Sequence, residues 1–234
     1  MGYARRPADV IECLALSSFS AMRYEPYQLA IFDFDGTLAD TFPWFCSVIN
    51  DVARRYRFRQ IAPDETDVLR GLSARALIRE LGVSTWKLPF ITRHMHDLAA
   101  RDIDAIMLFP GTSEMLRALD EAGITLAIVS SNSEANVRHV LGPCAARFCH
   151  YACGASMFGK AKRLKAVMRE AGSTGRVIYI GDELRDHDAA KAAICDFGAV
   201  SWGYTRRDAL AAAQPDLIFE HPSQIEEAIR PQRA

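Results

Sequence analysis

Short apolar runs alternate along most of the chain with segments in which apolar residues recur at helical spacing. The runs that we expect to form buried strands lie at residues 29–32, 126–129, 148–152, 177–180, 198–201 and 217–219. Helical spacing between these runs is clearest at residues 113–121 and 161–170. Such alternation is typical of a parallel sheet with helices on both faces, so the pattern predicts an α/β fold.

A long helical insertion separates the first two predicted strands. About ninety residues lie between them, whereas a crossover between parallel strands needs roughly a dozen. The segments with helical spacing in this insertion are residues 45–56, 74–81 and 89–100. Pro110 and Gly111 mark the return to the sheet. We therefore expect a core domain made of residues 22–42 and 110–234, interrupted by an all-helical cap domain at residues 43–109.

The composition favours a globular protein with a local binding site. Of the 234 residues, 50% are hydrophobic and 24% are charged, which is enough apolar material for a buried core. With 28 basic and 29 acidic side chains, the formal net charge of −1 creates no global field that attracts nucleic acid or an anionic membrane. No apolar run approaches the ~20 residues of a membrane span. We expect no nucleic-acid or membrane partner, and the oligomeric state does not follow from the sequence.

The cysteines and the N-terminal segment bear on the cellular compartment. Six cysteines are scattered without the paired CxxC spacing that grips zinc, so we interpret them as reduced thiols of a cytoplasmic protein. Near the N-terminus, Asp9 and Glu12 interrupt any hydrophobic stretch of a secretion signal. Residues 1–21 are therefore expected to be an N-terminal extension, and our hypothesis is that Met22 is the natural start.

Candidate chemistry begins where the first predicted strand ends. Asp33 and Asp35 stand two residues apart, so their carboxylates can converge at the carboxyl edge of the sheet, where doubly wound folds bind ligands. Gly36 permits a tight turn whose N–H groups can face an anion, and Thr37 completes a DxDGT segment. This segment is the first candidate part of an active site.

Polar residues also follow two later predicted strands. Ser130, Ser131 and Asn132 end the strand at 126–129. Asp182 and Asp186 lie in the segment that follows the strand at 177–180. These residues would meet Asp33 and Asp35 at the same edge of the sheet.

A lysine completes the set of candidates. Lys160 stands at the start of a predicted helix, and Lys162 within that helix is the second choice. Two acidic clusters beside a hydroxyl and a lysine fit a site in which a divalent cation neutralises the acids and the ligand is a phosphate. Mg²⁺ prefers oxygen ligands and commonly includes substrate phosphate in its shell.

The ordered segments resemble the four motifs of the haloacid dehalogenase superfamily. The matching residues are Asp33-Phe34-Asp35-Gly36-Thr37, Ser130, Lys160, and Gly181-Asp182 through Asp186. The resemblance covers essentially residues 28–220. An insertion directly after the first motif resembles the branch with a C1-type cap, which includes phosphoglycolate phosphatase-like enzymes and β-phosphoglucomutase. It implies a Rossmann-like parallel sheet with the active site under the cap.

The resemblance also implies roles for the motif residues. Asp33 would attack phosphorus and form an aspartyl-phosphate, and Asp35 would act as general acid and base. Ser130 and Lys160 would bind the phosphoryl oxygens. The implied Mg²⁺ ligands are the Asp33 carboxylate, the Asp35 backbone carbonyl and Asp182. Asp186, a further candidate in the metal site, would act through water or hold Lys160.

The cap is expected to select the substrate. Further candidates for substrate binding are Gly36, Thr37, Ser131, Asn132, Gly71 and Arg75. The segment around Gly71 joins two predicted cap helices and resembles the substrate loop of C1 caps. Arg70 or Arg75 could pair with a substrate carboxylate, and an exposed surface arginine is the alternative.

The function implied by the resemblance is hydrolysis of a small phosphorylated metabolite, such as phosphoglycolate or a sugar phosphate, with Mg²⁺ as cofactor. Asp35 argues against a dehalogenase, because a halide leaving group needs no proton. A phosphonatase would need a cap lysine for a Schiff base, and the cap has only Lys87. The alternatives are a phosphomutase of the β-phosphoglucomutase type, which keeps both acids, and a catalytically silent binding module of the same fold.

Overall fold

The computed structural model describes residues 26–154 and 159–230. The expected extension at residues 1–21 and the hypothesis on Met22 concern residues outside this part. Within the described residues, no helix is both long enough and apolar enough to cross a membrane.

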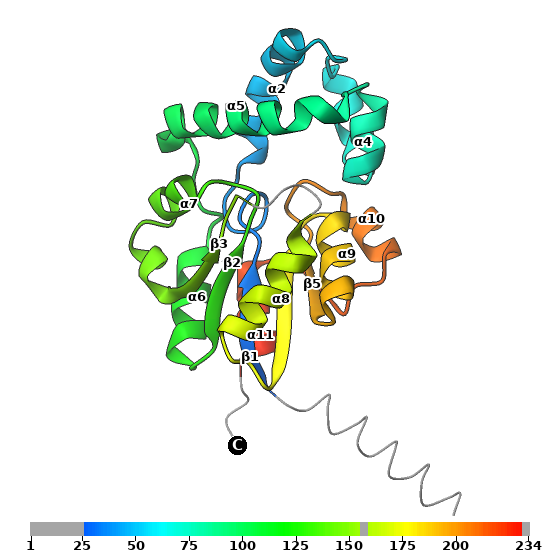
Figure 1. Ribbon diagram of the computed structural model, residues 1–234. Helices are drawn as coiled ribbons and strands as arrows, with labels where there is room; N and C mark the ends of the chain where they lie inside the picture. The colour runs from blue at the N-terminus through cyan, green and yellow to red at the C-terminus, as the bar shows by residue number, and fades with distance from the viewer. Residues whose placement is uncertain (1–25, 155–158, 231–234) are drawn as a thin grey trace, which may run out of the picture.

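A parallel sheet of six strands forms the centre of the molecule (Figure 1). Its strands are β1 (Tyr27–Phe32), β2 (Thr125–Val129), β3 (Phe148–Ala152), β4 (Arg176–Gly181), β5 (Asp196–Val200) and β6 (Leu217–Phe219). Their order across the sheet is β3-β2-β1-β4-β5-β6, and every neighbouring pair is parallel. The predicted α/β class with a Rossmann-like core is confirmed.

The register brings the carboxyl ends of the three central strands together. Phe32, the last residue of β1, pairs with Ile128 of β2 on one side and with Ile180 of β4 on the other. The order of strands along the chain reverses between β1 and β4. In open α/β sheets a ligand crevice forms outside the carboxyl ends at such a reversal. The residues that follow β1, β2 and β4 therefore meet at the predicted edge.

Helices cover both faces of the sheet. They are α6 (Thr112–Glu121), α7 (Glu134–Leu141), α8 (Lys160–Glu170), α9 (Leu184–Ala193), α10 (Arg207–Ala212) and α11 (Pro222–Ile229), with the short 3-10 helix η4 (Gly142–Arg147) after α7. Ala30 and Phe32 of β1 belong to the core cluster under α6 and α11, whereas Leu29 and Ile31 belong to the one under α8 and α9. Successive side chains of a strand point to opposite faces, so both faces are buried. Each fully buried Leu, Ile or Phe contributes about 1.5–3 kcal/mol.

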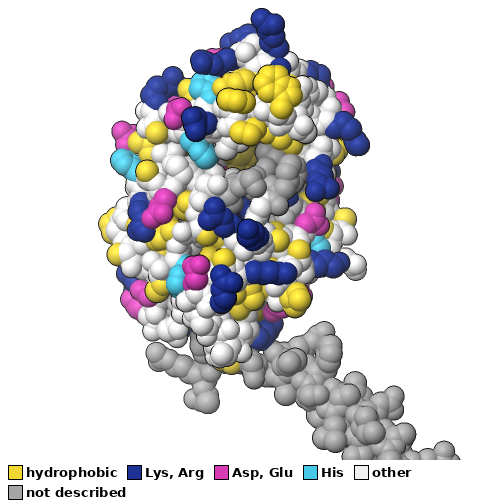
Figure 2. All heavy atoms as spheres, viewed as in Figure 1, with side chains coloured by type: hydrophobic (Ala, Val, Ile, Leu, Met, Phe, Trp, Pro, Cys, Tyr) yellow, Lys and Arg dark blue, Asp and Glu magenta, His cyan; other side chains and the backbone are white. Residues whose placement is uncertain are grey.

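A helical layer lies over the carboxyl edge of the sheet (Figure 1). Its elements are α2 (Phe42–Tyr56), η1 (Pro63–Glu65), α3 (Thr66–Leu69), α4 (Ala74–Glu80), η2 (Thr85–Lys87), α5 (Leu88–Arg101) and η3 (Ile103–Ala105). We call this layer the cap; its division from the core at residues 43–109 remains a prediction. Trp86 and Phe90 of the cap are 69% and 60% exposed. Figure 2 shows apolar side chains gathered at the cap end of the face in view.

The two ends of the cap are tied together where they meet the core. Ala39 and Leu108 form an isolated antiparallel bridge. Beside it, the N–H of Asp40 donates a hydrogen bond of 2.8 Å to the carbonyl of Met107. The cap therefore leaves and re-enters the core through one closed neck.

Candidate active site

The turn after β1 folds tightly against the loop that follows β4. Asp33 extends the pairing of β1, since its N–H donates to the carbonyl of Ile180 at 2.8 Å. Gly36 has a φ of +74°, and a Cβ at this position would lie 2.3 Å from Oδ2 of Asp182. Only glycine accommodates both this backbone conformation and this approach. The turn therefore brings the first motif against the fourth.

Three buried carboxylates converge at this point. Asp33 follows β1, Asp182 follows β4, and Asp186 lies in the first turn of α9. Each offers one oxygen, and these oxygens lie within 4.8 Å of one another. All three residues are at most 2% exposed. Such a cluster of hard oxygen donors is chemically suited to a divalent cation.

Lys160 bridges two of the three carboxylates. Its Nζ lies 2.5 Å from Oδ2 of Asp33 and 2.7 Å from Oδ1 of Asp186, and the lysine is 2% exposed. The first position of α8 brings this side chain into the site. Lys162, the second choice from the sequence, is exposed. Of the two lysines, it is Lys160 that the structure brings to the carboxylates.

The three carboxylates differ in their electrostatics. Burial raises the pKa of Asp33 to about 7 despite the opposing effect of Lys160. Burial, together with Glu183 and Asp186, raises the pKa of Asp182 well above its ordinary value. Burial also opposes ionisation of Asp186, but Lys160, Arg185 and the hydrogen bonds from Lys160 and Glu183 together outweigh it and hold the pKa of Asp186 below its ordinary value. Asp186 thus has a lysine as its partner, whereas Thr37 and Tyr204 are the described residues that hydrogen-bond Asp182, and both are neutral donors.

Neutral donors surround Asp182. Thr37 donates its hydroxyl to Oδ1 of Asp182 at 2.9 Å, and the N–H of Tyr204 donates to Oδ2 at 2.7 Å. Thr37, a candidate for substrate binding, is thus 1% exposed and held by the carboxylate. A carboxylate oxygen has lone pairs left after one such bond, so Asp182 retains capacity for a cation.

Asp35 stands apart from the cluster of three carboxylates. Nδ2 of Asn132 donates to both of its oxygens, at 3.0 and 3.2 Å. Burial raises the pKa of Asp35, which favours the protonated form that a general acid needs. Ser130 is fully buried, and its Oγ accepts the N–H of Asn132 at 3.1 Å. Asp35, Ser131 and Asn132 line a cavity under the cap.

One cap residue holds the core directly. Arg70, just after α3, donates from Nε to the carbonyl of Tyr204 at 3.0 Å and from Nη2 to that of Gly203 at 2.8 Å. Its guanidinium also lies over the ring of Phe42, 4.9 Å from the centroid. From the sequence, Arg70 or Arg75 could pair with a substrate carboxylate, with an exposed surface arginine as the alternative; the structure shows Arg70 bonded to backbone carbonyls, and a role in substrate binding remains a prediction.

Comparison with known proteins places this arrangement in a family. The model of the haloacid dehalogenase-like hydrolases matches residues 30–200. The chain belongs to this family. This hydrolase is 33% identical over 205 residues to a phosphoglycolate phosphatase of Synechococcus elongatus, covering 86% of the chain and 97% of that protein. The resemblance inferred from the motifs and the prediction of a phosphatase enzyme are confirmed.

A relative with another name and a solved structure extend the comparison. A tyrosine-protein kinase PtkA of Mycobacterium tuberculosis is 27% identical over 209 residues, covering 87% of the chain and 72% of that protein. The crystal structure of a putative phosphoglycolate phosphatase from Lactobacillus plantarum superposes with a TM-score of 0.74 at 23% identity. That match covers 87% of the chain and 99% of the crystallised one.

One functional candidate of the hydrolase, Arg185, was given no role from the sequence, and Tyr204 stood out there only as part of a Trp-Gly-Tyr segment whose loop could either approach the site or pack as an aromatic pair. Arg185 of α9 donates from Nη2 to Oε1 of Glu183 at 2.5 Å, and its Nε is buried with no hydrogen-bond partner in the part of the chain that the structure describes. Tyr204 binds Asp182 through its backbone N–H. Because almost every residue type has this group, the contact cannot be recognised from the amino-acid sequence. Glu183 and Arg185 stand in the fourth motif, but the pairing between them becomes visible only when α9 is in place.

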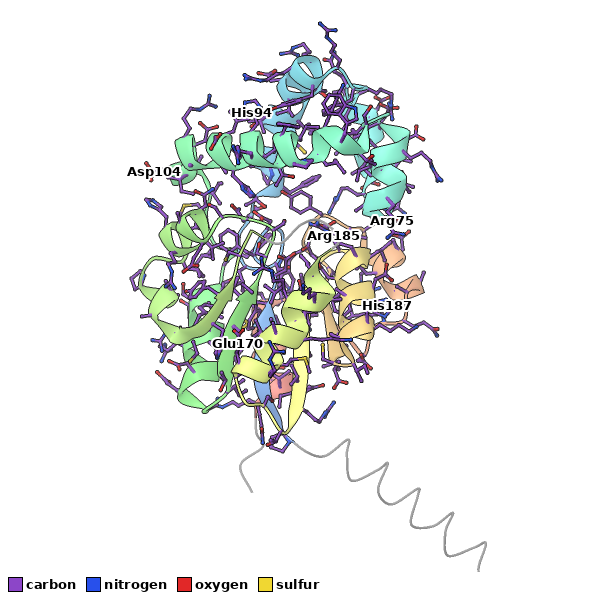
Figure 3. The ribbon with its side chains drawn as sticks, in the orientation of Figure 1. Arg75, His94, Asp104, Glu170, Arg185 and His187 are labelled. Carbon is purple, nitrogen blue, oxygen red and sulfur yellow. The ribbon has the colours of Figure 1, made fainter. Side chains whose placement is uncertain are left out.

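The remaining cap candidates lie at the edge of the site. Gly71 follows Arg70 and is half-buried, and Arg75 is exposed on α4. Figure 3 shows Arg75 at the end of α4 that faces the core, with Arg185 below it. Neither Gly71 nor Arg75 is among the described residues that line the cavity. A role for either in substrate binding remains a prediction.

Proposed function

We propose that this hydrolase is a Mg²⁺-dependent phosphomonoesterase that acts on a small phosphorylated metabolite through an aspartyl-phosphate at Asp33. The observation that carries the proposal is the contact of one lysine, Lys160, with both Asp33 and Asp186 beside Asp182. A buried nucleophile next to a lysine and a carboxylate cluster fits transfer of a phosphoryl group.

The carboxylate cluster fits Mg²⁺. Asp33 and Asp182 would hold the ion, as the resemblance to the family implies, and Asp182 is the carboxylate of the three that Lys160 does not contact. Both oxygens of Asp186 accept hydrogen bonds, Oδ1 from Lys160 and Oδ2 from the N–H of Glu183 at 3.1 Å. The raised pKa of Asp182 supports this assignment, because burial and neighbouring acids disfavour its charge until a cation arrives. When bound, Mg²⁺ neutralises the acids and stabilises charge on the phosphoryl oxygens.

Asp33 and Asp35 divide the covalent chemistry between them. In the first step an oxygen of Asp33 forms a bond to phosphorus, the ester P–O bond breaks, and Asp35 gives its proton to the leaving alcohol. In the second step Asp35 takes a proton from water, which attacks phosphorus and releases phosphate from Asp33. Asn132 orients Asp35 for both steps through its two contacts to the carboxylate.

Two groups support the transferring phosphoryl group. The ammonium of Lys160 is positive, because Asp186 and Asp33 raise its pKa more than burial lowers it. Ser130 offers its hydroxyl as a donor at the end of β2. Both groups balance the negative charge on the equatorial oxygens.

Release of phosphate from p-nitrophenyl phosphate tests the proposal, with phosphoglycolate as a second ester because relatives carry that name. We expect turnover with Mg²⁺, none with chelator, and a loss of at least 1000-fold in Asp33→Asn, since the nucleophile is removed. Asp188→Asn on the exposed side of α9 is the matched control and should retain activity.

The covalent step has its own measurement. Wild-type protein quenched during turnover should carry a phosphoryl label on Asp33 that hydroxylamine removes, and Asp33→Asn should carry none. Full turnover by Asp33→Asn, or an inert wild type across a broad ester panel, would contradict the proposal.

A further inference from the structure

A large cavity lies between the cap and the core of this hydrolase. Its volume is about 670 Å³, and it begins at Asp35. Its floor is polar and includes Asn132, Glu183 and Arg185 of the core. A cavity of this size is in the range of sites that enclose whole ligands rather than a two-carbon group.

The cap side of the cavity is apolar. The lining side chains come from three helices and include Phe45, Ile49, Leu77, Ile78, Ile91 and Met95. Few residues of these helices are buried: α4 has none, α5 has only Ala99, and α2 has Ile49, Val52 and Ala53. An amphipathic helix is stabilised when its apolar face is covered, so these walls favour an apolar occupant.

Positive charge is scarce in the cap part of the cavity. Among the described lining residues, the basic side chains of the cap are Arg70 and His96. The guanidinium of Arg70 is already bonded to the carbonyls of Gly203 and Tyr204. A carboxylate or a second phosphate that entered the cap would thus exchange its hydration water for contact with an apolar wall. Such desolvation of a charge is unfavourable in free energy. This also counts against the phosphomutase alternative, which needs a site for a second phosphate.

The floor of the cavity fixes how a substrate lies. Nε of Arg185 is a buried donor without a hydrogen-bond partner among the described residues, which is unfavourable until an acceptor arrives. It stands beside the side chains that we assign to phosphoryl transfer, so an oxygen of the ester group would satisfy it. The anionic end then faces the core, and the alcohol part extends into the cap.

We infer that the substrate is a phosphate monoester whose alcohol carries an apolar aromatic or medium-chain alkyl group. The inference rests on the proposed phosphatase function and narrows its substrate class. The apolar faces of α2, α4 and α5 enclose the alcohol part, and Arg185 contacts the ester end.

A series of n-alkyl phosphates from ethyl to octyl tests the inference, because the reactivity of the ester hardly changes along it. We expect kcat/KM to rise by roughly fourfold for each methylene that becomes fully buried. Phosphoglycolate should be a poorer substrate than hexyl phosphate. A flat series, or a preference for phosphoglycolate, overturns the inference while leaving a phosphatase.

A pair of cap variants locates the effect. Ala74 lines the cavity and Ala100 is exposed on α5. Ala74→Trp should fill part of the cavity and lower the ratio of kcat/KM for octyl over ethyl phosphate by at least tenfold. Ala100→Trp should keep the wild-type ratio. Equal ratios in the two variants would place the alcohol elsewhere and overturn the inference.

Binding measured without turnover separates the inference from the proposed function. Alkylphosphonates cannot be hydrolysed. In the presence of Mg²⁺, calorimetry should show that octylphosphonate binds more tightly than methylphosphonate. If no ester is hydrolysed but this order holds, the phosphatase proposal fails and the apolar cavity stands. Equal affinities overturn the inference whatever the activity.

Discussion

At the scale of single residues, the site is dominated by one uncompensated charge. Asp182 is fully buried, and its hydrogen-bond partners Thr37 and Tyr204 are neutral donors. Asp186 is compensated by Lys160, which lies 2.7 Å away. Without a cation the charged form of Asp182 is therefore disfavoured, and the binding of a cation stabilises it.

This leads to a prediction for Asp182→Asn. The amide keeps the size of the carboxylate, and its Oδ1 can accept from the N–H of Tyr204 while its Nδ2 donates to the hydroxyl of Thr37. The change removes the buried charge, so the metal-free variant should be more stable than the wild type. The wild type should gain about 2.7 kcal/mol from Mg²⁺ at a hundredfold excess over its Kd, which corresponds to about 5–10 °C in Tm. The variant should gain almost nothing. Thermal unfolding in EDTA and in Mg²⁺ measures both effects; an undiminished Mg²⁺ shift in Asp182→Asn would show that the ion binds elsewhere.

At the scale of elements, one loop serves both the cap and the carboxylates. The loop between β5 and α10 offers the carbonyls of Gly203 and Tyr204 to Arg70, while the N–H of Tyr204 holds Asp182. The hydroxyl of Tyr204 lies 3.0 Å from that of Thr41, just before α2. A shift of the cap is thus transmitted to a carboxylate through a single residue.

We therefore predict a catalytic effect of Arg70→Met. The change removes two hydrogen bonds from a charged donor, each worth about 1.5–3 kcal/mol. Loss of the equivalent of one such bond from the transition state lowers kcat/KM by roughly 10- to 150-fold, and we expect a fall of at least about tenfold. Arg70→Lys should restore little, since an ammonium cannot reach two carbonyls in the fork geometry of a guanidinium. Steady-state kinetics measures kcat/KM of each variant, and the control is Arg79→Met, at an exposed position of α4. Equal kinetics for the two methionine variants would disprove the coupling.

The elements differ in how far the sequence could predict them. The six strands could be located because strands buried on both faces are apolar runs, as in 126–129 and 177–180. The site residues Asp33, Lys160 and Asp182 could be predicted because they belong to motifs of charged residues that are recognisable in the sequence. The structure brings these three side chains together. The sequence left Arg70 as either a partner of a substrate carboxylate or a surface arginine. Its bonds to the carbonyls of Gly203 and Tyr204 could not be predicted, because they depend on the path of a distant loop. The apolar wall of the cavity depends on how three helices pack, which no local pattern specifies.

At the scale of the whole molecule, stability is distributed unevenly between the sheet and the cap. The residues of β1 are almost all buried, as are Met115, Leu116 and Leu119 of α6. The helices of the cap bury far less, and their apolar faces line a cavity. Elements with few buried contacts open at lower free-energy cost than the core.

The rates of amide hydrogen exchange should therefore differ between the cap and the core. Amides of α4 and α5 should exchange at least tenfold faster than those of β1 and of α6, which is a helix of similar length in the core. Octylphosphonate with Mg²⁺ should slow exchange in the cap selectively, because it covers the apolar faces. Exchange of α4 as slow as that of β1 would contradict this picture.

The closed neck, through which the cap leaves and re-enters the core, has a consequence for how such proteins evolve. Because the bridge between Ala39 and Leu108 joins both ends of the cap, a foreign helical segment could be inherited between them without altering the register of β1. Mutation and recombination can then change what the protein recognises while Asp33, Lys160 and Asp182 keep their places. Related proteins that share this connection between cap and core can therefore differ in the esters they bind and still catalyse the same reaction.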